Sequence, residues 1–100
     1  MTGVFGLFRR QNPGFKDDGN FLLARVKTAR NGEIIHVRLS KTSEMSVEAR
    51  GYYVRKVLIG PKTLDQAILE VVMNRSHKVL NVTVDGGHLV PVREWSQTDG

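Results

Sequence analysis

Residues 50–72 read Arg-Gly-Tyr-Tyr-Val-Arg-Lys-Val-Leu-Ile-Gly-Pro-Lys-Thr-Leu-Asp-Gln-Ala-Ile-Leu-Glu-Val-Val, and this stretch decides the fold that the sequence predicts. Its first ten residues interleave aromatic, basic and β-branched side chains, which is typical of a β-strand. Gly60-Pro61 then ends the strand, because both residues favour turns. After this turn the spacing of the apolar residues changes, and we interpret the remainder as a helix.

The helix predicted after this turn begins at Thr63, a residue suited to the N-cap position. Gln66 stands three residues later and completes a capping box. Asp65 lies in the first turn, where its negative charge favours the helix dipole. The apolar residues recur at helical spacing and form one face: Leu64, Ala67, Ile68, Val71 and Val72. We expect this helix to cover one face of a sheet.

A pair of strands is predicted after the helix. Residues 79–84 alternate apolar and polar side chains, and Asp85-Gly86-Gly87-His88 is a turn signal that leads into residues 89–95. We therefore expect a terminal hairpin. Pro91 has no N–H for a strand ladder, which places the strand over residues 89–95 at a sheet edge.

Residues 21–30 allow two interpretations, of which the first is a hairpin. Residues 21–29 and 33–40 are then strands joined at Asn31-Gly32. One face of this hairpin is apolar and pairs Val26 with Val37, Thr28 with Ile35 and Ala24 with Leu39. The other face pairs Arg25 with Arg38 and Lys27 with His36. Like charges directly opposed destabilise a sheet, so this cluster suggests an anion site; the alternative is a solvated face whose long side chains splay apart.

The second interpretation makes Asn20 the N-cap of a helix over residues 21–30. Leu22, Val26 and Ala29 share one face of that helix. Asn31-Gly32 then ends the helix before a strand over residues 34–39. The order of elements becomes strand, helix, strand, strand, helix, strand.

Both interpretations predict the same fold class, an α+β domain. We expect a two-layer structure in which a mostly antiparallel sheet of four to five strands is covered on one face by one or two helices. The 100 residues suffice for a single domain, with an N-terminal arm and connector over residues 1–20 and a frayed tail over residues 96–100.

The amino-acid composition indicates which classes of binding partner and which cellular location to expect. Fifteen Lys and Arg against ten Asp and Glu give a net charge of +5, which favours anionic partners such as nucleic acid or an acidic membrane surface. The absence of cysteine excludes disulfides and cysteine-bound zinc. No apolar run approaches the ~20 residues of a membrane span, and we see no export signal, so we expect a cytoplasmic protein.

Residues 31–84 resemble the RNA recognition motif family. Residues 31–39, Asn-Gly-Glu-Ile-Ile-His-Val-Arg-Leu, are similar to the turn and second strand of that family. Arg50-Gly51-Tyr52-Tyr53-Val54 is similar to its basic-Gly-aromatic strand motif. Residues 64–68 look like the start of its second helix, and residues 79–84 would be its fourth strand. The resemblance implies that an unpaired base stacks on a tyrosine of the sheet while nearby cations neutralise phosphates.

The two adjacent tyrosines of this motif differ from the family pattern, which has a small residue between its aromatics. Successive side chains of a strand point to opposite faces, so Tyr52 and Tyr53 cannot serve one surface together. We favour Tyr53 and Arg55 as the solvent-facing pair, because Tyr52 then joins Val54 and Leu58 on the covered face.

Two functional hypotheses follow, and neither is enzymatic. The first is a nucleic-acid-binding domain for RNA or single-stranded DNA that uses Arg25, Lys27, His36, Arg38, Tyr53 and Arg55. The second is an adaptor or assembly protein that docks a protein partner or a second copy through an edge strand or through an apolar N-terminal arm made by Val4, Phe5, Leu7 and Phe8. The histidines are isolated, so we predict no catalytic residues, metal or cofactor.

Overall fold

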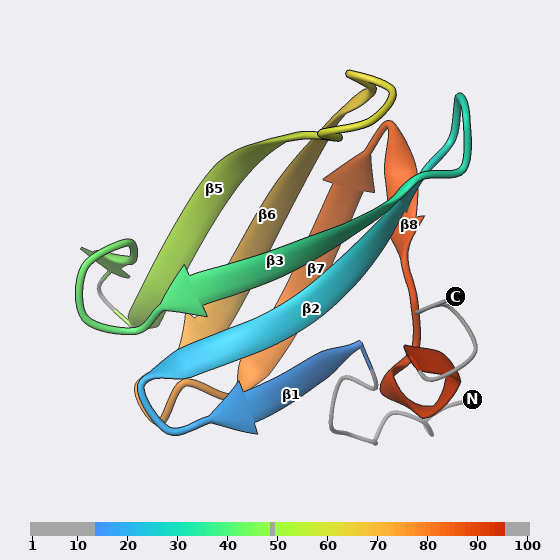
Figure 1. Ribbon diagram of the computed structural model, residues 1–100. Coiled ribbons are helices and arrows are strands. Elements are labelled where there is room, and N and C mark those ends of the chain that lie inside the picture. The colour runs from blue at the N-terminus through green and yellow to red at the C-terminus, as the bar shows by residue number, and fades with distance from the viewer. Residues whose placement is uncertain (1–13, 49, 96–100) are drawn as a thin grey trace, which may run out of the picture.

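The computed structural model describes residues 14–48 and 50–95, and they form two antiparallel β-sheets packed face to face (Figure 1). The first sheet contains β1 (Phe15–Asp18), β2 (Phe21–Thr28), β3 (Ile34–Ser40) and β8 (Gly87–Leu89). The second contains β4 (Ser46–Glu48), β5 (Gly51–Ile59), β6 (Gln66–Asn74) and β7 (Val79–Asp85), in that spatial order. A short 3-10 helix, η2 (Val92–Glu94), follows β8.

β2 is the central strand of the first sheet. It pairs with β3 along one edge, and its other edge is shared by β1 and β8. The chain passes to the second sheet between β3 and β4, and it returns to the first sheet at Gly86, between β7 and β8. The two sheets are therefore joined at two ends of the sandwich.

The hydrophobic core lies between the sheets. Every second residue of β2, β3, β5 and β6 points inward, as the two-residue period of a strand requires. The largest of the fully buried side chains are Leu39, Leu69, Met73, Val26 and Val71. Because four strands each bury one face only, their opposite faces remain available for function.

The prediction of an α+β fold is wrong. In the described part of the chain no helix covers either sheet, and the predicted helix over residues 64–72 is strand β6. Ala67, Leu69, Val71 and Met73 face the core at a spacing of two. Ala67 and Val71 belong to both the helical and the strand pattern, which is why the sequence allowed a helix.

The predicted capping box at Thr63 is instead a turn between β5 and β6. The Thr63 hydroxyl accepts a hydrogen bond from the Asp65 N–H and donates one to Glu33 Oε1, at 3.2 and 2.7 Å. Leu64 has a φ of +63°, which is outside the helical region. The local hydrogen bonds of threonine, which favour a cap and a turn alike, here make a turn.

Residues 21–28 form a strand, so the hairpin interpretation of this segment holds, but its register was predicted incorrectly. Thr28 and Glu33 close the hairpin, leaving a four-residue loop instead of Asn31-Gly32 alone. The register is displaced by two residues, so each side chain keeps its predicted face. Arg25 now lies opposite His36, Leu23 opposite Arg38 and Lys27 opposite Ile34. The predicted opposition of like charges, Arg25 with Arg38, does not occur.

The predicted terminal hairpin is also wrong. β7 pairs with β6, whereas β8 pairs with β2 in the other sheet. The second strand, expected over residues 89–95, ends at Leu89; the Val90 N–H then donates to the Arg25 carbonyl and the chain enters η2 after Pro91. The adaptor hypothesis therefore loses that edge strand as its docking surface.

At the opposite end of the chain, β1 lies within residues 1–20, where only a connector was expected. Val4, Phe5, Leu7 and Phe8 of the predicted arm and residues 96–100 of the predicted tail lie outside the described residues. Within the described part of the chain we find no helix that is both long and apolar enough to span a membrane.

Candidate nucleic-acid interface

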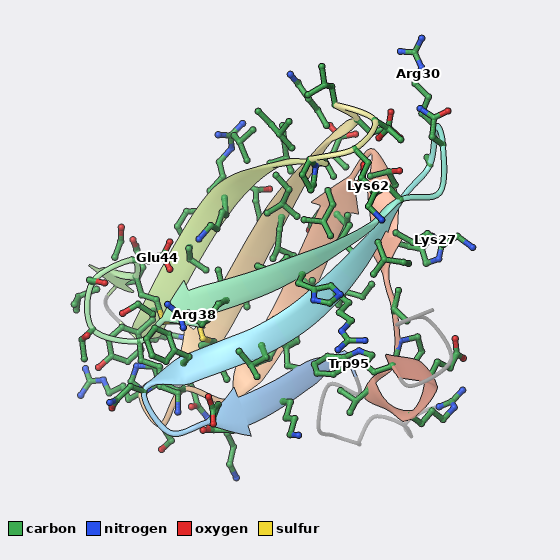
Figure 2. The ribbon with its side chains drawn as sticks, in the orientation of Figure 1. Lys27, Arg30, Arg38, Glu44, Lys62 and Trp95 are labelled. Atoms are coloured by element: carbon green, nitrogen blue, oxygen red, sulfur yellow. The ribbon has the colours of Figure 1, made fainter. Side chains whose placement is uncertain are left out.

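The outer face of the first sheet gathers most of the residues that the sequence singled out. Leu22, Ala24, Val26 and Thr28 of β2 are buried, so the residues between them point outward. The register then places Arg25 and Lys27 of β2 beside His36 and Arg38 of β3. Four of the six predicted binding residues thus share one face, which Figure 2 views directly, with Trp95 lying beside β2.

Positive charge dominates this face. Its described outward positions on β1, β2, β3 and β8 hold four Lys or Arg side chains, which are Lys16, Arg25, Lys27 and Arg38. The same positions hold one carboxylate, Asp18. A surface with this imbalance attracts anions over about one Debye length.

Two aromatic rings hold the arginines in place. The Arg38 guanidinium lies over the Phe21 ring at 4.3 Å from its centroid, and that of Arg25 lies over the Trp95 ring at 4.6 Å. Arg25 also donates a hydrogen bond from Nη1 to the Trp95 carbonyl at 2.9 Å. Stacking fixes the plane of each guanidinium, and a guanidinium plane is a flat surface on which another ring can stack.

A hollow of about 220 Å³ lies between these stacked pairs. Leu23, His36, Arg25, Arg38 and Trp95 are among the residues that line it. This volume is below the roughly 300–1,000 Å³ of pockets for drug-sized ligands, so it suits a single planar ring. Trp95 is anchored by a hydrogen bond from its Nε1 to the Val90 carbonyl at 3.1 Å.

Tyr53 and Arg55 do not join this face. Both point outward from β5, as predicted, but β5 belongs to the second sheet and its outer face lies on the far side of the sandwich. The Tyr53 hydroxyl donates to Glu70 Oε2 at 2.6 Å, and this hydrogen bond raises the pKa of the tyrosine. The sequence therefore placed these two side chains on the right side of their strand but could not assign the strand to a sheet.

Phe21 and Trp95 also belong to this face and were not predicted from the sequence. Phe21 alternates in phase with Leu23 and Arg25, which was a usable signal once a strand was assumed. Trp95 had no such signal, because its position depends on the turn of the chain at Pro91 and on η2.

A larger groove, of about 540 Å³, runs between β3 and β5. Two cations line it, Arg38 and Lys56, and Lys56 is already paired with Glu44, whose Oε2 lies 2.6 Å from the lysine Nζ. This hydrogen bond lowers the pKa of Glu44 and keeps the carboxylate ionised. With two cations and one carboxylate, the groove has less excess positive charge than the outer face of the first sheet.

Comparisons of the chain with protein-family models, with curated proteins and with solved structures found no match. Within the described residues, no group of three or more histidine or carboxylate side chains is arranged to hold a metal ion. The candidate interface is thus defined by its own geometry and charge.

Proposed function

We propose that this protein binds single-stranded nucleic acid, either RNA or DNA, across the outer face of its first sheet. The observation that carries the proposal is the pair of arginines stacked on Phe21 and Trp95 on either side of a ring-sized hollow. Unpaired bases stack on aromatic rings and on guanidinium planes, and this recognition needs no particular base sequence.

Each side chain has a distinct role in this mechanism. A base enters the hollow beside His36 and stacks against a guanidinium plane, which contributes about 1–3 kcal/mol per base. Lys27 and Arg38 neutralise the phosphates on either side, and released counterions supply much of the affinity. Arg25 is held by Trp95 and shapes the hollow. Absence of enzymatic activity and a cytoplasmic location remain predictions from the sequence.

The direct test is a titration of labelled single-stranded RNA and DNA, followed by fluorescence anisotropy at two salt concentrations. Lys27→Ala with Arg38→Ala removes two phosphate contacts, so we expect the affinity to fall by at least about tenfold. The slope of log affinity against log salt concentration should become shallower by about two. The matched control is Arg50→Ala with Lys78→Ala, which removes the same charge from two exposed turns of the second sheet and should leave binding unchanged.

The results that oppose the proposal are equally definite. Equal losses in the test and control pairs would mean that net charge alone attracts the nucleic acid. Vesicles of anionic phospholipid that bind as tightly as the oligonucleotides, with the same loss in the test pair, would make a membrane surface the better partner. No binding at low salt would exclude the function.

A further inference from the structure

The outer face of the second sheet exposes several large apolar side chains on β5 and β6. Val57, Ile59 and Val72 are 51, 53 and 39% exposed, and Ile68 lies directly opposite Val57 on the neighbouring strand. Val57, Ile59 and Ile68 are neighbours at one end of β5 and β6, whereas Val72 lies beyond the next pair of residues, beside Tyr53. Contiguous apolar patches on soluble proteins mark interaction sites.

One ion pair interrupts this patch. Arg55 on β5 lies directly opposite Glu70 on β6, with Arg55 Nε 3.9 Å from Glu70 Oε2. Val57 and Ile68 flank the pair on one side, and Tyr53 and Val72 flank it on the other. On the β7 side the face is polar, because Asp85, Thr83 and Asn81 lie opposite Ile68, Glu70 and Val72. The face thus carries Arg55 and Glu70 at its centre, with apolar groups along β5 and β6 and a second negative charge, Asp85, at its β7 edge.

We propose that this face joins two copies of the chain back to back. A twofold axis that runs along the strands, midway between β5 and β6, places β5 of one copy over β6 of the other. Arg55 then meets Glu70 of the second copy, and Val57 meets its Ile68. An axis across the strands would instead place Arg55 on Arg55, so charge complementarity selects one arrangement. A partner that carried only positive or only negative charge would repel either Arg55 or Glu70.

The size of the face sets the strength of this dimer. Three strands about 4.8 Å apart and about 30 Å long present roughly 400 Å² per copy. The total buried area is then below the ~1,200 Å² of stable interfaces. We therefore expect a transient dimer that forms with rising concentration. Sheets that pack face to face in this way align within about 30° of each other.

Sedimentation velocity between about 10 µM and 1 mM, without nucleic acid, measures this equilibrium. Val57→Ser with Ile59→Ser should raise the dimer dissociation constant by at least about tenfold. The control, Val47→Ser with Leu64→Ser, removes two apolar side chains that are 80 and 73% exposed but lie off this face, and should leave the constant unchanged. A wild type that stays monomeric throughout, or equal effects in both pairs, would overturn the proposal.

A charge exchange gives a sharper test of the arrangement. Arg55→Glu and Glu70→Arg should each abolish the dimer, because each opposes like charges at both contacts. An equimolar mixture of the two variants should form a heterodimer, since every contact then joins opposite charges. No heterodimer from folded single variants would contradict the twofold geometry. If the arm over residues 4–8 or another protein binds this face instead, the wild type should stay monomeric and the mixture of the two variants should form no heterodimer.

Discussion

Asp65 is a buried carboxylate that connects the loops at one end of the sandwich. It is 6% exposed and accepts hydrogen bonds from the Thr28 hydroxyl and from the backbone and side-chain nitrogens of Asn31, at 2.6–2.9 Å. Burial raises its pKa, but these hydrogen bonds outweigh the burial and lower the pKa below its ordinary value of 3.8. The loop after β2 is thus fixed to the loop before β6.

Replacing Asp65 tests this connection. Because its pKa is lowered in the folded state, the ionised carboxylate stabilises the fold above pH 3.8, and this contribution is lost as the pH falls through the lowered value. Asp65→Asn should lower the Tm by roughly 5 °C at neutral pH, and the difference from the wild type should shrink as the pH falls below 3.8. Asp85→Asn, at an exposed position, is the control. A pH-independent difference would show that hydrogen-bond geometry, not charge, is what the variant loses.

Leu64, which precedes Asp65, has a strained backbone conformation. Its φ of +63° is a conformation that costs an L-residue about 1–2 kcal/mol, and its side chain is 73% exposed, so packing does not compensate. Leu64→Gly should therefore raise the free energy of unfolding by roughly 0.5–1 kcal/mol after the entropy cost of glycine. Leu64→Ala keeps the strain and should change little. Urea denaturation measures both variants, and a less stable glycine variant would contradict the interpretation.

At the scale of the element, the pairing of β5 with β6 depends on Gly51. A Cβ built there would overlap the Met73 carbonyl oxygen and lie 2.8 Å from the Asn74 Cα. Gly51→Ala must therefore separate the two strands at this point and should cost more than about 2 kcal/mol of stability. Gly19→Ala is the control, since its site has open space and bears only the strain of a φ of +66°. Equal Tm losses would argue against the close approach.

Strand faces were predictable from the sequence, whereas strand partners were not, apart from the local hairpin of β2 and β3. Alternation in residues 21–28, 34–40 and 51–59 assigned the correct sides to Arg25, Arg38 and Tyr53 without any knowledge of the fold. The sheet that each strand joins depends on long-range pairing, which no local pattern encodes. Four of the six residues predicted to bind therefore share one face, whereas Tyr53 and Arg55 lie on the other sheet.

β6 shows the second limit of local patterns. Thr63, Gln66 and the apolar spacing all favoured a helix, and only tertiary pairing with β5 and β7 decided the outcome. Its Ile68, Val71 and Val72 are β-branched and suit a strand, but their preference is context-dependent. When the apolar residues of a segment fit both the helical and the strand spacing, the strands that pair with the segment determine its structure.

At the scale of the whole molecule, the outer face of the first sheet is basic and that of the second sheet exposes apolar side chains on β5 and β6. The proposed back-to-back dimer would place the two basic faces on opposite sides, about 30 Å apart, which is three sheet spacings of ~10 Å. An oligonucleotide of about 8 nucleotides reaches only one of the two basic faces. One of about 60 residues can pass around the dimer and occupy both, which raises its apparent affinity through effective concentration.

This difference in length separates the two proposals in a single experiment. Val57→Ser with Ile59→Ser adds no charge, so affinity for the short oligonucleotide should equal that of the wild type. Affinity for the long one should fall by about tenfold, because the second face is no longer held nearby. Anisotropy at low salt measures both. Equal affinity of variant and wild type for the long strand would mean that nucleic acid is bound by single copies, whereas loss on both lengths would place residues of β5 in the binding face itself.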